Sequence, residues 1–148
     1  MNKLERIIYS LGTSNRSIEE FLEILKAYSI NLVVDVRRFP TSKFAHFKKE
    51  NLKNFLLKEN IKYLYLGKEL GGYRNGGYES YINTEEFKKA IEFLKELSQE
   101  NTLCIICAEK IPFRCHRCFI AQELAKDKEL KVIHILEKGE TFLCSHYT

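Results

Sequence analysis

Short apolar runs alternate along this chain with segments whose hydrophobic residues recur every three or four positions. Continuous apolar runs rich in β-branched residues are typical of strands buried on both faces, and the three-to-four spacing is typical of amphipathic helices. The apolar runs predict five strands, at residues 6–11, 31–36, 61–66, 102–107 and 130–136.

Four segments with helical spacing lie between and around these runs. Ser17 and Glu20 form a Ser-x-x-Glu capping box, in which a hydroxyl and a carboxylate satisfy free amide groups at a helix start. Asn83 or Thr84 can cap the third helix. The predicted helices follow Ser17, cover about residues 48–59, extend from the Asn83–Thr84 cap to Leu97, and cover about residues 115–126.

Strands that alternate with helices imply right-handed crossovers and a parallel sheet. The sequence therefore predicts an α/β, three-layer Rossmann-like domain with a mainly parallel sheet of about five strands covered by helices on both faces. A length of 148 residues without a linker fits a single domain over residues 1–148. No apolar run approaches the roughly 20 residues that span a bilayer, and the N-terminus lacks signal-peptide character, so we expect a cytoplasmic protein that does not enter a membrane.

Charge is concentrated in the loops that follow the first four strands. The whole chain carries +4, whereas residues 12–17, 35–43, 67–77 and 107–117 together carry +6 and the remainder −2. The loops that leave parallel strands meet at the carboxyl edge of the sheet, where helix N-termini add partial positive charge. This edge is predicted to bind a small anionic ligand, with phosphate as a plausible anion.

Four of the five cysteines lie between Cys104 and Cys118. Cys107 ends a predicted strand, where a small buried hydrophobe is the alternative interpretation. Cys115 lies at a predicted helix start beside Arg114, His116 and Arg117, a setting that favours the nucleophilic thiolate, although a structural helix-cap position is the alternative. The functional interpretation is stronger for Cys115 than for Cys107.

The same cysteines form a Cys-x2-Cys-x7-Cys-x2-Cys pattern that resembles a zinc site. Cys104 and Cys107 lie three residues apart in a predicted strand, so their side chains point to opposite faces. We therefore predict no metal site from this pattern.

Other loop residues are candidates for substrate contacts. Arg16, Arg37 and Arg38 follow the first two strands, and at least one of them is expected to contact an anion, although solvated surface charges are the alternative interpretation. Asp35 near the end of a buried strand is expected to pair with a cation. The loop at 67–77 holds five of the seven glycines but no Walker or dinucleotide signature, so no cofactor is indicated. Its Gly71, Gly72 and Tyr73 are predicted to form a lid or a wall of the substrate site.

Four motifs lie in the loops after the strands: Gly12-x-Ser14-Asn15-Arg16, Asp35-Val36-Arg37 with Pro40, Glu69-Leu70-Gly71-Gly72, and Cys107-Ala108-Glu109-Lys110-x-Pro112-x-x-Cys115-His116-Arg117. Together they resemble one family, DUF488, a domain of unknown function. The resemblance implies an α/β fold and functional motif cysteines, but supplies no reaction. Cys104 and Cys118 lie outside the family motif, and Thr13 stands where family members commonly have His.

The leading hypothesis is an enzyme that uses Cys107 and Cys115, as nucleophile or redox pair, on a phosphorylated or nucleotide-like substrate. Glu109 is the expected proton-transfer group. The predicted substrate-binding residues are Asn15, Arg16, Asp35, Arg37, Gly71, Gly72, Tyr73, Lys110, His116 and Arg117.

Two other classes of function stay open at this point. A nucleic-acid-binding module would use the positive edge for phosphate and Tyr73, Tyr78 and Tyr81 for base stacking, although these tyrosines fit equally well as packing for the lid. A metal-binding or thiol redox protein would use the cysteines without substrate turnover.

Overall fold

A six-stranded sheet forms the centre of the computed structural model, which describes residues 6–40, 42–112 and 115–144. The strand order is β3-β2-β4-β1-β5-β6, and all neighbouring pairs are parallel except β5 with β6. The mainly parallel α/β prediction is confirmed. The five predicted strands are β1 (Arg6–Gly12), β2 (Leu32–Asp35), β3 (Lys62–Tyr65), β4 (Leu103–Cys107) and β5 (Leu130–Glu137).

The sixth strand, β6 (Glu140–Leu143), was not predicted from the sequence. It pairs antiparallel with β5 at the edge of the sheet, after a turn in which Gly139 has a φ of 81°. None of its residues is fully buried, so it lacks the continuous apolar run that marked the other strands.

Four main helices follow the predicted pattern: α1 (Ile18–Ala27), α2 (Lys49–Lys58), α5 (Glu85–Leu97) and α6 (Arg117–Ala125). The predicted caps are present, because Ser17 Oγ accepts a hydrogen bond from the amide of Glu20 and Thr84 Oγ1 accepts one from the amide of Phe87. The carboxylate of Glu20 bonds to Arg16. Three short elements were not predicted: the 3-10 helix η1 (Ala45–Phe47), α3 (Gly67–Leu70) and α4 (Tyr78–Tyr81).

The prediction that residues 67–77 form one irregular loop was wrong for its first part. α3 occupies the start of this segment, and Leu70 at its end is fully buried in the core. The buried side chain ties the turn to the sheet, which glycine content alone does not reveal. Positive backbone φ angles occur only later, at Tyr73, Gly76 and Gly77.

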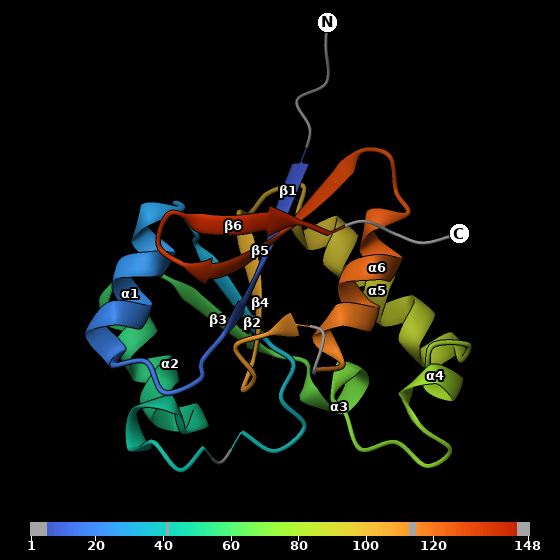
Figure 1. The fold of residues 1–148 in the computed structure, drawn as a ribbon, viewed down its shortest axis with the longest axis horizontal. Helices are drawn as coiled ribbons and strands as arrows, with labels where there is room; N and C mark the ends of the chain where they lie inside the picture. The colour runs from blue at the N-terminus through green and yellow to red at the C-terminus, as the bar shows by residue number, and fades with distance from the viewer. Residues whose placement is uncertain (1–5, 41, 113–114, 145–148) are drawn as a thin grey trace, which may run out of the picture.

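The helices form a layer on each face of the sheet (Figure 1). α1 and α2 pack on one face, whereas α5 and α6 pack on the other. Strand β4 alternates between the two cores, with Cys104 and Ile106 on the α1 and α2 side and Ile105 and Cys107 on the α5 and α6 side. This alternation confirms that Cys104 and Cys107 point in opposite directions.

The reversal in strand order places a crevice at the end of β4. The chain leaves β1 and β2 toward the α1 and α2 layer, but leaves β4 toward α6 on the opposite face. Gly12 of β1 is the register partner of Cys107, and Asp35 of β2 is the partner of Ile106. Neighbouring loops therefore diverge around Cys107, as at the ligand-binding edge of other doubly wound sheets.

Within the described residues, no helix is both long and apolar enough to cross a membrane.

Candidate functional site

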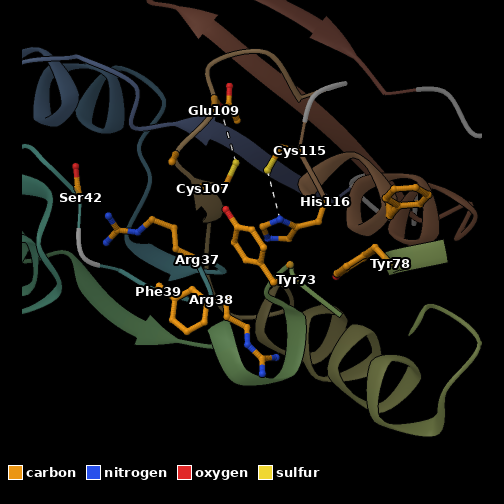
Figure 2. A pocket seen from close by; sticks show the side chains of 13 residues that line it. Arg37, Arg38, Phe39, Ser42, Tyr73, Tyr78, Cys107, Glu109, Cys115 and His116 are labelled. Atoms are coloured by element: carbon orange, nitrogen blue, oxygen red, sulfur yellow. Dashed lines mark hydrogen bonds between the residues drawn. The ribbon is translucent and has the colours of Figure 1, made fainter. Parts of the chain in front are cut away.

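A pocket of about 720 Å³ opens at the carboxyl edge of the sheet, beside the end of β4. Its walls come from the segments that follow β2, β3 and β4 and from the start of α6 (Figure 2). The lining residues are Arg37, Arg38, Phe39, Ser42, Gly72, Tyr73, Tyr78, Cys107, Ala108, Glu109, Cys115, His116 and Phe119.

Two cysteines meet in this pocket. Cys107, the last residue of β4, is 1% exposed, and Cys115 just before α6 is partly buried. Their side chains turn toward one another (Figure 2), and the Cys115 thiol is placed to lower the pKa of Cys107 as a hydrogen-bond donor. Both thiols are free. The structure thus brings together the two cysteines that the sequence singled out.

The pKa values of the two thiols are shifted in opposite directions. Burial raises the pKa of Cys107, but the hydrogen bond from Cys115 and the charge of Arg117 outweigh it, so the pKa falls below its ordinary 9.0. The hydrogen bond to Cys107, together with burial, raises the pKa of Cys115 far above its ordinary value. The sequence favoured Cys115 as the activated thiol, whereas the geometry gives Cys107 the more acidic thiol.

His116 lies beside this pair and is neutral. Its Nε2 is 2.8 Å from the carbonyl oxygen of Val36, which can only accept, so Nε2 carries the hydrogen. Nδ1 therefore presents its lone pair to Cys115 Sγ, 3.6 Å away. Burial lowers the pKa of His116, which keeps the ring unprotonated at neutral pH. His116 Nδ1 is thus a hydrogen-bond acceptor for the Cys115 thiol.

Glu109 contributes a carboxylate to the pocket from the turn after β4. The residue is exposed, and its backbone oxygen lies 3.8 Å from Cys107 Sγ. Gly12 supports this turn from β1, because a Cβ there would lie only 2.0 Å from the Glu109 backbone oxygen. Close approach of the two loops requires glycine at this position.

Asp35 has the cation partner that the sequence predicted. The side chain of Arg37 donates to both carboxylate oxygens, at 2.9 and 2.8 Å, and Tyr63 donates to the same carboxylate at 2.5 Å. Arg37 also donates to the Phe47 carbonyl oxygen, at 2.6 Å. Arg37 lines the pocket, but its charge is neutralised inside the protein.

Two further predicted binding residues are held by internal partners. Arg16 is 3% exposed and donates to the carbonyl oxygens of Gly12 and Leu136 and to the carboxylate of Glu137. Lys110 pairs with Glu137 at 2.5 Å. Neither residue lines the 720 Å³ pocket, so a substrate role for them stays a prediction.

Asn15 and Lys110 line a neighbouring hollow of about 550 Å³, which shares Ser42, Ala108 and Glu109 with the main pocket. Arg117 is fully buried and lines neither cavity.

Gly72 and Tyr73, two of the three residues of the predicted lid or wall, line the pocket. A Cβ at Gly72 would lie 3.2 Å from Nδ1 of His116, so glycine lets the wall approach this ring. Tyr73 is 86% exposed, and its ring centroid is 5.8 Å from that of Phe39, which is 64% exposed. The two rings form an aromatic rim on the pocket. Gly71 lies behind the wall and does not line the cavity.

The sequence placed Arg38 among the candidate anion contacts, but it missed several other lining residues, of which Phe39 is the most informative. One guanidinium nitrogen of Arg38, Nη1, is buried and has no hydrogen-bond partner among the described residues. Arg38 lies against Phe39, with 6.0 Å between its Cζ and the ring centroid, and its guanidinium turns away from the two sulfurs (Figure 2). The sequence signal that could have predicted Phe39 was an aromatic residue that follows a cation shortly after a strand.

The structure also bears on the two alternative functions. Tyr78 donates to the Leu70 carbonyl oxygen and Tyr81 is 8% exposed, so only Tyr73 of the three tyrosines presents an open ring for stacking. In the described part of the chain, no cluster of three metal-ligating side chains is found. The thiol redox alternative would use the same Cys107 and Cys115 pair. Arg114, which the sequence placed beside Cys115, lies outside the described residues.

Comparison with protein families gives one match. Residues 17–124, which are 108 of the 148 residues, match a family described as "Domain of unknown function DUF488". The matched region includes the whole Cys107 to Arg117 segment but excludes Asn15 and Arg16. Comparisons with curated proteins and with solved structures found no match.

Proposed function

Since the chain belongs to the DUF488 family, whose description assigns no activity, we propose a function from the pocket itself. The protein is an enzyme that acts on a small anionic substrate, phosphorylated or nucleotide-like, at the carboxyl edge of the sheet. Cys107 is its nucleophile.

The acidic thiol of Cys107 in a pocket is the observation that carries this proposal. A cysteine that only fills space in a core has a pKa raised by burial, as Cys104 has, where the pKa rises to about 12. Cys107 is almost as buried, yet its pKa is lowered. A thiolate is the reactive form of cysteine, so this environment supports nucleophilic catalysis.

Three neighbours are suited to proton transfer around this nucleophile. Cys115 holds one hydrogen between two acceptors, the sulfur of Cys107 and Nδ1 of His116. Glu109 faces the pocket from the other side and can exchange a proton with the substrate or its leaving group. When Cys107 bonds to an electrophilic atom of the substrate, these groups can protonate the group that departs.

The substrate class follows from the outer part of the pocket. Arg38 lines the pocket, and its buried Nη1 has no hydrogen-bond partner among the described residues, so its guanidinium suits an oxyanion such as phosphate. Phe39 and Tyr73 offer exposed rings, on which a flat heterocycle can stack. A nucleotide carries both an anionic group and a flat base.

The test is turnover after separate replacement of the two cysteines. Phosphorylated metabolites and nucleotides are first screened for binding, by their effect on the melting temperature, and then for conversion. We expect Cys107→Ser to lower turnover by at least about three orders of magnitude, because the nucleophile is lost. Cys115→Ser is expected to retain part of the activity, because its thiol only assists Cys107.

Cys118→Ser is the matched control, since Cys118 lies outside the pocket and outside the motif. Circular dichroism must show that all three variants are folded. Full activity of both Cys107→Ser and Cys115→Ser would rule out the thiol mechanism.

A further inference from the structure

The largest fully buried side chain in the described part of the protein is a cation, Arg117. Its Nη2 donates to the carbonyl oxygen of Lys110 over 3.2 Å, while Nε and Nη1 have no hydrogen-bond partner among the described residues. No carboxylate of that part of the chain forms an ion pair with it. A buried charge without a counter-ion is strongly destabilising, so a negative partner is needed.

The surroundings of Arg117 limit what this partner can be. α6 covers the sheet face that carries Ile8 of β1, Val132 of β5 and Cys107 of β4. Ser10 and His134 lie on this face by strand alternation, and they hydrogen-bond to each other at 2.7 Å.

Serine is not an acid, and His134 is neutral, because burial and the charge of Arg117 lower its pKa to about 4. Neither residue can therefore balance the guanidinium. A thiolate is the anion that this face can supply.

His116 and four cysteines also feel the charge of Arg117. Cys104, Cys115 and Cys118 have raised pKa values, so they stay neutral thiols. Cys107 differs because it also receives the hydrogen bond from Cys115. The backbone amide of Arg117 in turn donates to Cys115 Sγ, at 3.4 Å, which holds the helix start against the pair.

We propose that Arg117 is a positioning residue whose buried guanidinium is the counter-ion of a Cys107 thiolate. The guanidinium lies beneath the turn that follows Cys107, and it acts through the protein interior without touching the substrate. This role replaces the anion clamp that the sequence suggested for Arg117. The inference rests on the proposed function, since it explains how Cys107 is kept reactive before any substrate binds.

The other charged groups around Cys107 do not provide this balance. The carboxylate of Glu109 opposes ionisation of the thiol, and His116 is neutral. Arg37 lines the pocket, but it is paired with Asp35. Arg117 thus supplies the positive charge, and Cys115 supplies the hydrogen bond.

The thiolate can be measured without any substrate. The rate of iodoacetamide alkylation of Cys107 is followed by peptide mass spectrometry between pH 5 and pH 10, in wild-type protein and in Arg117→Gln. We expect the midpoint of the wild-type profile to lie below the ordinary thiol value of 9.0. In Arg117→Gln the midpoint should rise, and the rate at pH 7 should fall at least about tenfold, the change in thiolate fraction for one pKa unit.

Arg117→Lys retains a charge, so it should restore most of the alkylation rate at pH 7. Lys126→Gln is the matched control, because it removes an exposed cation at the end of α6 that is paired with Glu123. Its profile should match that of the wild type. A folded Arg117→Gln variant with the wild-type profile would overturn the proposal.

A second measurement decides the question if Arg117→Gln does not fold. Cys107→Ser removes the thiolate and leaves the guanidinium without a counter-ion, so it should lower the melting temperature at pH 8. Adding Arg117→Met to Cys107→Ser should recover part of this loss. A Cys107→Ser protein as stable as the wild type at pH 8 would also overturn the proposal. Neither measurement uses turnover, so an inactive protein would reject the proposed function and leave this inference standing.

Discussion

At Asp35 a fully buried carboxylate and a buried guanidinium neutralise each other. The side chain of Arg37, two positions later in the chain, donates a hydrogen bond to each oxygen of the carboxylate, and Tyr63 of β3 donates a third. The arrangement places the segment after β2 along the pocket wall. It also accounts for an acidic residue in a strand that is otherwise entirely apolar.

Replacing Arg37 tests this arrangement. Arg37→Ala leaves the carboxylate of Asp35 buried without its counter-ion, so the free energy of unfolding should fall by about 3–5 kcal/mol. Urea denaturation measures this loss. The control is Lys26→Ala, which breaks an ion pair with Glu59 that is largely solvent-exposed, and should change stability by about 1 kcal/mol or less. Similar losses in both variants would contradict the structural role of Arg37.

Among the elements, the short helix α3 and the glycines after it shape the wall of the pocket. Gly71 has a φ of −69°, which any residue can adopt, so backbone freedom is not why glycine is found there. The reason is space, because a Cβ would lie 2.3 Å from the Gly67 oxygen and 2.7 Å from Cα of Arg38. Both neighbours are backbone atoms and cannot turn aside.

A methyl group at Gly71 should therefore displace α3 from the segment after β2. We expect Gly71→Ala to lower the free energy of unfolding by about 1–3 kcal/mol, the usual range for overpacking. Gly139→Ala is the control, because nothing lies within 4 Å of its added methyl and only the positive φ opposes it. Urea denaturation of both variants gives the comparison. A larger loss at Gly139 would contradict the spatial argument.

On the scale of the whole molecule, stability should depend on pH through a buried neutral histidine. Burial and the charge of Arg117 lower the pKa of His134 from 6.5 to about 4. The unfolded chain therefore binds a proton between these values that the folded protein does not bind, and stability falls as the pH falls through this window. The difference between these two pKa values corresponds to about 3 kcal/mol in the free energy of unfolding.

Chemical denaturation at pH 7 and pH 4 measures this loss. His134→Gln should lose less stability than the wild type over the same interval, because glutamine does not titrate, whatever the substitution costs at pH 7. An equal loss in both proteins would show that other groups, such as His116, account for the acid sensitivity.

Local pattern was sufficient to predict the five main strands, the four main helices and the caps at Ser17 and Thr84. Periodicity and capping depend on neighbours in the sequence, so they can be read without the fold. The α/β class follows from the order of these elements, and it places Cys107 at the carboxyl edge. β6 was not predicted, because its pairing with β5, and not its own composition, makes it a strand.

The partners of charged groups that pair across distant segments were decided only by the tertiary structure. Arg16 and Lys110 look alike as cations in positive loops, but Glu137 at the end of β5 pairs with both of them. Arg117 is fully buried because α6 closes over the sheet. Ionisation depends on burial and on neighbours brought together from distant segments. The sequence by itself thus determined the framework and the pair of cysteines, and the packed structure decided which of the two is the acidic thiol.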